Sequence, residues 1–410
     1  MNRVVAGALA VAVVLVGLAV GVLAGTAVSP AASAAPSTPG IALASPSVVP
    51  STPAPAGSPS GTTPPPTPSA TPLPTPTPTP GPVLVPAPLT GVLVPEAVAD
   101  RHPVAVMVDD LSPARPQSGF SAASVVWQAP AEGGIPRYMM VFQENIPGDV
   151  GPVRSSRYYY IAWAAELRAV YAHAGGSPQA LATLKAKGGG QLVYNADEFR
   201  WGGSFRRSAS PPSSTGAPRF GPHNLYTTGK QLRALVTATG AKDGPIAWPW
   251  TFAADAPLAE RPVGGRIQVT YQANVIRYDY NRATNTYLRS VSVEGKEYDG
   301  STKQRVAPKN VIVMQMVFGP LNDGEYAKKH RLEAQVVGSG KAWISTNGVT
   351  IKGTWRKPSL TAPTRFFDSQ GNPVTLTVGQ TFIQVMKTTD PITFVAGKPA
   401  PLPLPGPGRN

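Results

Sequence analysis

The chain of 410 residues has no cysteine and only four histidines, and a long stretch near its start carries no charge. The lack of cysteine excludes disulfides, thiol catalysis, iron–sulfur clusters, cysteine-ligated zinc and a lipid-modified N-terminal cysteine. Four histidines leave little material for a histidine-rich metal site, and we predict none. No charged residue lies between Arg3 and Glu96, so the net charge of +14 belongs to the rest of the chain.

An uncharged apolar run over residues 4–28 follows Arg3. It is long enough to span a bilayer, which takes about 20 apolar residues, and longer than the apolar part of a cleaved signal peptide. The small residues at 32–34 fit a signal cleavage site. We predict that residues 1–28 form a single-pass transmembrane anchor, with a cleaved signal segment as the alternative. Both readings put the bulk of the chain outside the cytoplasm, and Arg3 agrees with the positive-inside rule.

Proline dominates the next segment, where it supplies 20 of the 59 residues from 30 to 88. Proline has no amide donor and does not fit helix interiors or central strands. The Ser, Thr, Ala and Gly around it cannot bury a core. We therefore predict a disordered Pro/Thr/Ser-rich linker over residues 29–88, and a Pro-rich tail over residues 391–410.

Strand and helix patterns alternate between residues 89 and 245. The apolar run over residues 104–108 ends in acidic residues, which is typical of a buried strand in an α/β sheet. A helical spacing of apolar residues follows over residues 158–170, then a further strand over residues 171–174. This alternation predicts an α/β N-terminal domain over residues 89–245.

The pattern changes to period-two alternation after Arg266. Several strand candidates follow, and Asn347-Gly348 between two of them is a strong tight-turn signal. We predict a smaller, β-rich C-terminal domain with an antiparallel sheet over residues 246–390.

Two arginines stand three residues apart in the segment 151–157, just before a predicted helix. The guanidinium groups of Arg154 and Arg157, two serine hydroxyls and the free amides of a helix start suit an anion such as phosphate. The alternative is that one arginine pairs with an internal carboxylate and the other is solvated. Both arginines are candidate ligand-binding residues.

His173 stands before a turn between a predicted strand and a predicted helix. Gly175 and Gly176 permit close approach of the backbone to a ligand, and Ser177 adds a hydroxyl to this polar corner. We take these three as candidate ligand-binding residues and His173 as a catalytic candidate. A buried structural histidine is the alternative for His173. The corner is not a Walker A loop, because the Gly-Lys-Ser/Thr ending is absent.

Further polar candidates lie elsewhere in this domain. Asp109 follows the predicted strand at 104–108, at an edge where α/β sheets commonly bind ligands. Glu132 stands beside two glycines, where it serves as a general base or caps a turn. We take Asp109 and Glu132 as candidate catalytic carboxylates. His223 and Asn224 follow a Ser/Pro-rich insert and are candidate ligand-binding residues of the same cleft.

Basic and aromatic residues also gather in the second half of the chain. They are Lys352, Trp355, Arg356, Lys357, Arg365 and Phe366. This mixture is typical of a polyanion or glycan contact. The alternative is a set of ordinary solvated cations beside core aromatics.

Six segments occur in this order along the first domain: PVAVMVDD, ARPQSGF, AEGGIPRYMMVFQ, GPVRSSR, YAHAGGSPQAL and PHNLYT. Together they resemble the YerB-like family of bacterial cell-envelope proteins, a domain of unknown function. The resemblance continues through VVGSGKAWI, GTWRKPS, PTRFFD and GQTFIQV, and covers roughly residues 89–385. It implies an extracytoplasmic protein with an α/β N-terminal domain and a smaller β-rich C-terminal domain.

The chain departs from this family at two points. Family members of the type lineage are lipoproteins anchored through an N-terminal cysteine, which is missing here, so residues 4–28 replace that anchor if anchoring is retained. Where the family usually has Tyr-Glu, this chain has Trp127-Gln128. If that glutamate is catalytic in the family, this chain has lost it, and Glu132 is the better candidate.

A looser likeness is to cell-wall phosphotransferases of the LytR–CpsA–Psr type, in which arginines hold a polyprenyl pyrophosphate. The corresponding order here is Asp109, Arg115, Arg154 and Gly175-Gly176. The Arg-Ser-Asp-Thr core of those enzymes is absent. The likeness implies Arg115 as a further ligand-binding candidate.

A basic protein outside the cell meets acidic partners such as lipid head groups and wall polymers, and we expect no nucleic acid. We expect a membrane-anchored envelope protein that binds an anionic cell-wall polymer, a wall precursor or a wall-synthesis protein, without a cofactor. The alternative is a wall-precursor transferase or hydrolase with a phosphate-binding Arg/Gly cleft. In that case Asp109 or Glu132 is the base, and His173 or His223 the proton donor. Magnesium is then expected at Asp109 or Asp110.

Overall fold

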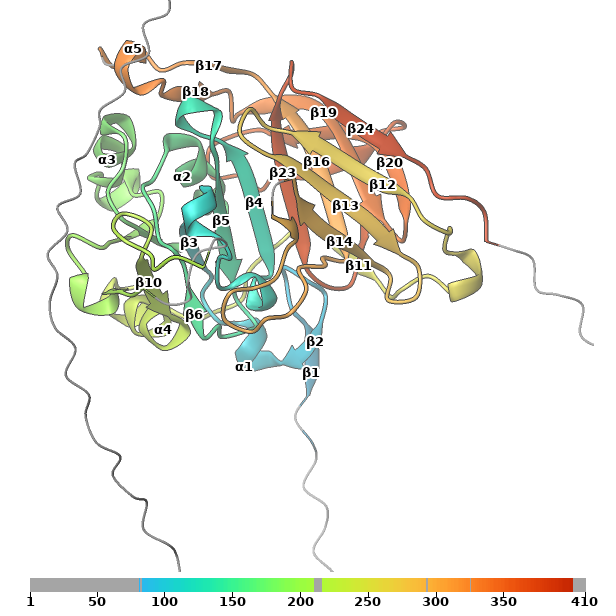
Figure 1. Cartoon of the computed structure of the whole chain (residues 1–410). Coiled ribbons are helices and arrows are strands. Elements are labelled where there is room, and N and C mark those ends of the chain that lie inside the picture. The colour runs from blue at the N-terminus through green and yellow to red at the C-terminus, as the bar shows by residue number, and fades with distance from the viewer. Residues whose placement is uncertain (1–80, 82, 210–215, 293, 325, 401–410) are drawn as a thin grey trace, which may run out of the picture. The chain divides into compact units, whose positions relative to one another are not determined.

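The structure is a computed structural model that describes residues 81, 83–209, 216–292, 294–324 and 326–400. The predicted anchor, and the predicted linker up to residue 80, lie outside these residues. Within them the fold is mostly β, with few helices (Figure 1). None of the helices in this part has the length and apolar character needed to cross a bilayer.

A ten-stranded sheet runs through both halves of the chain. Its strands, in spatial order, are β21 (Arg365–Asp368), β20 (Val349–Lys357), β19 (Gly338–Thr346), β16 (Asn310–Met316), β23 (Thr381–Lys387), β4 (Val125–Pro130), β5 (Pro136–Phe142), β3 (Val104–Asp109), β7 (Val170–His173) and β8 (Tyr194–Asp197). The two halves join where β23 pairs in parallel with β4. The predicted α/β and β-rich segments therefore share one sheet.

The sheet is mixed, which corrects the prediction of an antiparallel sheet in the second half. Strand β23 runs parallel to both β16 and β4, whereas the β16–β19 and β19–β20 pairs are antiparallel. The physical reason is burial, because six of the seven residues of β23 are buried. Strands covered on both faces are typical of parallel pairing.

Helices cover both faces of the first half of the sheet (Figure 1). Ala105 and Met107 of β3 pack in one hydrophobic cluster with α2 (Tyr158–Ala165) and α3 (Pro178–Leu184). The alternate residues of β3 pack on the other face in a second cluster with α4 (Gly229–Ala238). The predicted strand at 104–108 is thus confirmed.

The predicted helix over residues 158–170 is too long at its end. Helix α2 stops at Ala165, and the chain reverses at Arg168, where φ is +44°. Strand β7 then begins at Val170. The apolar spacing continued past the helix end because β7 is itself buried on both faces.

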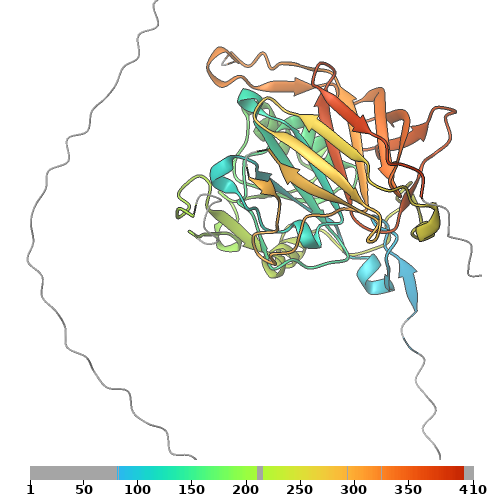
Figure 2. The ribbon, with the colours of Figure 1, turned by 45° about the vertical axis from the view of Figure 1, so that its right-hand side comes forward.

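A second, antiparallel sheet of five strands covers one face of the second half (Figure 2). Its order is β15 (Gly295–Lys296), β14 (Thr286–Val291), β13 (Val275–Asn281), β12 (Arg266–Thr270) and β24 (Ile392–Val395). Strand β24 lies inside the predicted Pro-rich tail, which is therefore corrected at residues 392–395. Ile392 and Phe394 explain this, since both pack against the hydrophobic cluster below the sheet.

Short elements complete the described part. They are β1 (Leu84–Pro86), β2 (Leu93–Pro95), α1 (Glu96–Ala99), β6 (Asp149–Val150), β9 (Arg206–Arg207), β10 (Leu225–Thr228), β11 (Thr251–Ala253), β17 (Phe318–Pro320), α5 (Tyr326–Lys329), β18 (Leu332–Ala334) and β22 (Thr375–Thr377). Strand β1 pairs with β2 in antiparallel fashion. The predicted linker is therefore corrected at its end, because backbone pairing to β2 holds residues 84–86 despite Pro86.

A buried polar network lies between the two sheets. The side chain of Arg289, on β14, is fully buried and pairs with Glu297. It also donates hydrogen bonds to Gln128 Oε1 at 2.8 Å, to the Tyr138 hydroxyl at 2.8 Å and to the Tyr278 hydroxyl at 3.0 Å. Gln128 and Tyr138 belong to β4 and β5, so this one guanidinium ties the small sheet to the first half of the large one.

Gln128 extends the network to a second ion pair. Its Nε2 donates to Asp110 Oδ2 at 2.6 Å, and Asn274 Nδ2 donates to the same oxygen at 3.2 Å. Arg115 pairs with Asp110 at 2.8 Å and with Glu294 at 2.8 Å. The contacts of Asn274 with Asp110 and of Arg115 with Glu294 again join residues of the first half to residues of the second.

We predict that Arg289→Ala destabilises the whole described fold by about 3–5 kcal/mol, because removal of one partner leaves buried Glu297 and Gln128 without it. Urea unfolding followed by circular dichroism measures this. The control is Arg277→Ala, which removes an exposed ion pair with Asp279 and should cost less than about 1 kcal/mol. Equal losses for both variants would contradict the role given to Arg289.

Candidate functional site

Asp109 ends strand β3 and is almost fully buried. Its Oδ2 lies 2.7 Å from His223 Nδ1 and 3.0 Å from Arg154 Nε. Burial alone raises the pKa of the Asp109 carboxyl, but the His223 hydrogen bond and the charges of Arg154 and Arg137 outweigh burial, so the pKa is lowered. Asp109 is therefore a stable carboxylate at neutral pH, and His223 is held in place by it.

Glu132 forms a second centre of charge next to the first. Its carboxylate pairs with Arg157 and lies 3.3 Å from Arg137 Nη2. Burial raises the pKa of Glu132, but the charges of Arg137 and Arg157 outweigh burial and lower it. Arg137, the second residue of β5, stands directly opposite Asp109 in the β3–β5 register, so the two carboxylates share this neighbour.

The backbone segment 151–157 explains why the arginines reach this edge. Strands β3 and β7 pair only as far as Val106 and Ala172. Beyond that point the segment lies between them, where Arg154 N donates to Met107 O at 2.9 Å and Arg154 O accepts from Ala174 N at 3.0 Å. Arg154 is therefore held at the carboxyl ends of two parallel strands, a usual place for ligands in such sheets.

We call Arg137, Arg154, Arg157, Asp109 and Glu132 the arginine cluster. Three guanidinium groups face two carboxylates, which leaves an excess of positive charge. Arg154 is 18 % exposed and Glu132 is 20 % exposed, so solvent reaches the cluster at these two residues. Within the described part of the chain, the guanidinium of Arg154 makes the ion pair with Asp109 but no hydrogen bond. Its Nε is buried against Asp109, and the exposed part of the guanidinium is available to an anion.

The structure keeps His173 apart from the solvent-facing part of this cluster. The residue is fully buried, with Nδ1 2.8 Å from Gly175 O and Nε2 2.8 Å from Asn195 Oδ1. Both ring nitrogens are thus used inside the protein. This arrangement fits the structural role that was the alternative for His173.

The Gly175–Ser177 corner adjoins the arginine segment, but its polar groups form hydrogen bonds within the protein. Gly175 has φ of +63°, and its N–H donates to Asp197 Oδ1 at 3.1 Å. Gly176 forms a bridge with Ser156. The Ser177 hydroxyl caps α3 by accepting from Ala180 N at 3.3 Å. These contacts support the corner itself rather than a ligand.

The other predicted site residues lie in separate places. Arg115 is buried in the network between the sheets, where Asp110 and Glu294 neutralise it. Asn224 follows His223 in the chain, but its Oδ1 accepts from Arg207 at 3.3 Å. Neither joins the arginine cluster.

Under the enzyme alternative, magnesium was expected at Asp109 or Asp110. In the structure, most of the oxygens of these two carboxylates already have other partners. Both oxygens of Asp110 already accept from Arg115, Gln128 and Asn274, and Oδ2 of Asp109 faces His223 and Arg154. In the residues that the structure describes, no group of three or more acidic or histidine side chains is placed to hold a metal ion.

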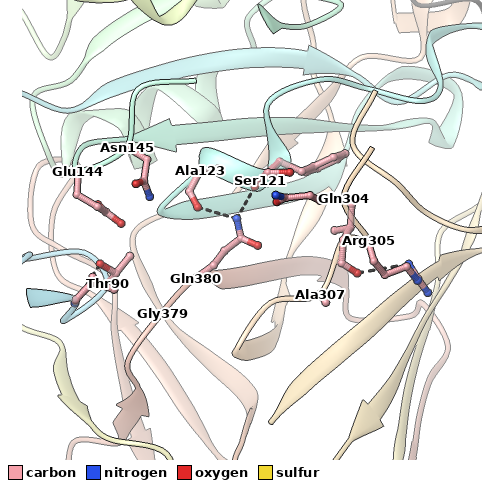
Figure 3. Close-up of a pocket in the computed structure, with 13 residues that line it drawn as sticks. Thr90, Ser121, Ala123, Glu144, Asn145, Gln304, Arg305, Ala307, Gly379 and Gln380 are labelled. Carbon is pink, nitrogen blue, oxygen red and sulfur yellow. Dashed lines mark hydrogen bonds between the residues drawn. The ribbon is translucent and has the colours of Figure 1, made fainter. Parts of the chain in front are cut away.

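A polar pocket of about 280 Å³ lies elsewhere, at the junction of the two halves (Figure 3). Its lining includes Thr90, Ser121, Glu144, Asn145, Gln304, Arg305 and Gln380. Gln380 Nε2 donates to Phe120 O at 2.6 Å and to Ala123 O at 2.7 Å, so this amide ties the halves together. None of the predicted site residues lines this pocket.

The structure divides the basic and aromatic residues of the second half between core and surface, which is closer to the alternative of cations beside core aromatics than to one shared contact. Lys357 is fully buried and pairs with Glu166 at 2.8 Å, and Trp355 is also buried. Lys352 and Arg356 are exposed and alternate with these residues along β20, on the opposite face. The strand period divides the motif between core and surface.

Sequence reasoning passed over two residues that matter here, Arg137 and Gln128. Arg137 closes the EGGIPR segment, and only the β3–β5 register reveals that it stands opposite Asp109. The amide of Gln128 donates to Asp110, while its oxygen accepts from Arg289. An amide suits this position because it offers a donor and an acceptor at once.

Comparisons with known proteins agree with this architecture. The family model "Protein of unknown function (DUF3048) N-terminal domain" matches residues 89–242, and the corresponding C-terminal domain matches residues 267–383. The chain is 28 % identical over 317 residues to the Bacillus subtilis (strain 168) protein named "Putative lipoprotein YerB", across 76 % of this chain and 89 % of that protein.

A solved structure gives the same result in three dimensions. The crystal structure of YerB protein from Bacillus subtilis superposes with a TM-score of 0.63 and 25 % sequence identity. The match covers 73 % of this chain and 96 % of that one.

We predict that Asp109→Asn destabilises the protein at neutral pH, and that the difference from the wild type shrinks in acid. Because the folded pKa of Asp109 is lowered, its stabilisation is present above the ordinary value near 3.8 and is lost as pH falls through the folded pKa. Urea unfolding between pH 7 and pH 3 measures both curves. A difference that stays constant across this range would contradict the pairing of Asp109 with Arg154 and His223.

Proposed function

We propose, from the premise that this chain belongs to the DUF3048 family, that it is an extracytoplasmic envelope protein whose arginine cluster binds a phosphate-bearing wall polymer or wall precursor. The relative is named as a lipoprotein, a class of protein held at membranes by a lipid. This chain has no cysteine for such a lipid. The apolar residues 4–28 then take over as a single-pass anchor, and the proline-rich segment carries the folded part away from the membrane.

The guanidinium of Arg154 carries this proposal. It is partly exposed, its single carboxylate contact is an ion pair without a hydrogen bond, and it stands beside two further arginines. Planar guanidinium groups bind phosphate through pairs of N–H donors. An arriving phosphate gains these donors while Asp109 keeps its hydrogen bond from His223. The same chemistry serves a polymer, a lipid-linked precursor or the acidic surface of a wall-synthesis protein.

We predict that Arg154→Gln weakens binding of poly(glycerol phosphate) by about ten- to a hundredfold, since hydrogen bonds to charged groups contribute about 1.5–3 kcal/mol. Isothermal titration calorimetry at fixed low salt measures the affinity. Arg277→Gln is the matched control, because it removes the same charge from an exposed ion pair in the second half. Neutral dextran controls for general polymer binding.

Two results would count against phosphate binding at this cluster. One is equal loss of affinity in both variants, which indicates a general charge effect. The other is wild-type binding of dextran as strong as that of the phosphate polymer.

A second candidate function rests on the Asp109–His223 pair. The His223 ring is 20 % exposed, its Nδ1 is fixed by a carboxylate, and within the described residues its Nε2 contacts no partner. This is the arrangement of a general base held by a buried acid. It favours the wall-precursor transferase or hydrolase, with His223 rather than His173 as the proton carrier. Nε2 accepts the proton of an attacking hydroxyl while its oxygen forms a bond to phosphorus beside Arg154, and the bond from phosphorus to the leaving oxygen breaks so that the leaving group departs as an anion.

We predict for this second function that the protein releases 4-nitrophenolate from bis(4-nitrophenyl) phosphate, and that His223→Gln lowers the rate about a hundredfold or more. Absorbance at steady state over pH 5 to 9 measures the rate, with His102→Gln as the control histidine variant. A wild-type protein without turnover, or a rate that His223→Gln leaves unchanged, removes the enzymatic function and leaves binding.

A further inference from the structure

A cavity of about 630 Å³ lies in the second half of the chain, between the five-stranded sheet and the β19–β20 hairpin. Strands β12 and β24 form one wall, and residues of β19, β20 and the turn between them form the other. The side chains of the arginine cluster do not line it. Its volume falls within the range of about 300–1,000 Å³ that small-molecule sites occupy.

Four aromatic residues line the cavity. Trp343 and Phe394 stack with their centroids 5.6 Å apart and an interplanar angle of 27°. Tyr280 and Tyr287 lie beside them, with centroids 5.1 Å apart. Both tyrosine hydroxyls are used within the protein, the first donating to Asn285 Oδ1 at 2.7 Å and the second accepting from Gly348 N at 3.0 Å. What these rings present to the cavity is therefore apolar.

The end of the cavity is closed by the predicted tight turn at Asn347-Gly348, which the structure confirms between β19 and β20. Both residues have positive φ, +50° and +77°. A Cβ on Gly348 would come within 2.3 Å of the Tyr280 ring. Only glycine allows the turn to pack directly against the Tyr280 ring. The turn and the cavity wall that contains Tyr280 are therefore in direct contact.

One cation at the rim, Lys352, has no counterion among the residues that the structure describes. Lys352 pairs in register with Trp343, so the two side chains share the face that borders the cavity. Lys352 is exposed, and within the described residues it forms no ion pair or side-chain hydrogen bond. The other rim cation, Arg266, is held by Asp279 at 2.6 Å. An anion at the mouth therefore meets one ammonium group with no competing carboxylate.

We propose that this cavity binds a small amphiphilic anion, whose apolar body packs on Trp343 and Phe394 while its single carboxylate, phosphate or sulfonate group contacts Lys352. The argument is one of charge and shape together. The apolar walls exclude a highly charged polymer, and the lone ammonium favours one negative group over none. This site is separate from the arginine cluster, so the proposal can be tested independently of the function proposed above.

Two fluorescent probes with the same kind of aromatic body test the proposal on the full chain. One is 8-anilinonaphthalene-1-sulfonate, which carries a negative charge, and the other is N-phenyl-1-naphthylamine, which is neutral. We expect both to bind the wild type, the charged probe more tightly. Lys352→Gln should weaken the charged probe about fivefold or more and leave the neutral one unchanged. Trp343→Leu, which keeps an apolar side chain, should weaken both.

Arg356→Gln is the matched control, because Arg356 is an exposed cation four residues further along the same face of β20. It should leave both affinities unchanged, and circular dichroism confirms that each variant is folded. Equal effects of Lys352→Gln and Arg356→Gln, unchanged binding in Trp343→Leu, or a wild type that binds neither probe would each overturn the proposal.

Discussion

The fully buried guanidinium of Arg289 is the contact on which the relation between the two sheets depends. A buried charge is tolerated only where partners surround it, and here the partners come from β4, β5 and β13. Apolar packing between two sheets permits small shifts of one sheet over the other, whereas this network fixes one arrangement. The two segments that match separate family models therefore form one structure, because pulling them apart leaves a charge and several polar groups without partners.

The same network positions the candidate site. Asp109 and Asp110 are neighbours at the end of β3 and point to different surroundings. Asp110 turns into the network, where Arg115 and Gln128 hold it, and Asp109 turns toward Arg154 and His223. Because Asp110 is fixed, the direction of Asp109 is fixed as well. The buried network around Asp110 therefore fixes the position of the partly exposed arginine cluster.

Local patterns predicted much of this fold, and long-range pairing accounts for what they missed. The buried strand at 104–108, the strand-to-helix corner and the Asn347-Gly348 turn each follow from a few adjacent residues. Arg115 became a ligand candidate through the likeness to wall phosphotransferases, and its burial between Asp110 and Glu294 was not foreseen because Glu294 is 179 residues away. Lys357 looked like part of a basic patch for the same reason, since Glu166 lies 191 residues before it. Of the candidate site, the sequence motifs pointed to Asp109, Glu132, Arg154, Arg157 and His223, but not to the distances between them.

The two candidate binding regions differ in whether their cations already have carboxylate partners. In the arginine cluster every guanidinium already has a carboxylate nearby. The free energy of phosphate binding is therefore only the difference between the new phosphate–arginine contacts and the contacts with Asp109 and Glu132 that they replace. Such exchange favours reversible contact with a repeating polymer, where many weak sites add up. Within the part of the chain that the structure describes, Lys352 has no carboxylate partner, so an anion at the mouth of the cavity competes with no internal ion pair. Under the two proposals, carboxylates balance the binding cations in the arginine cluster, whereas the binding cation of the cavity, Lys352, is unbalanced among the described residues.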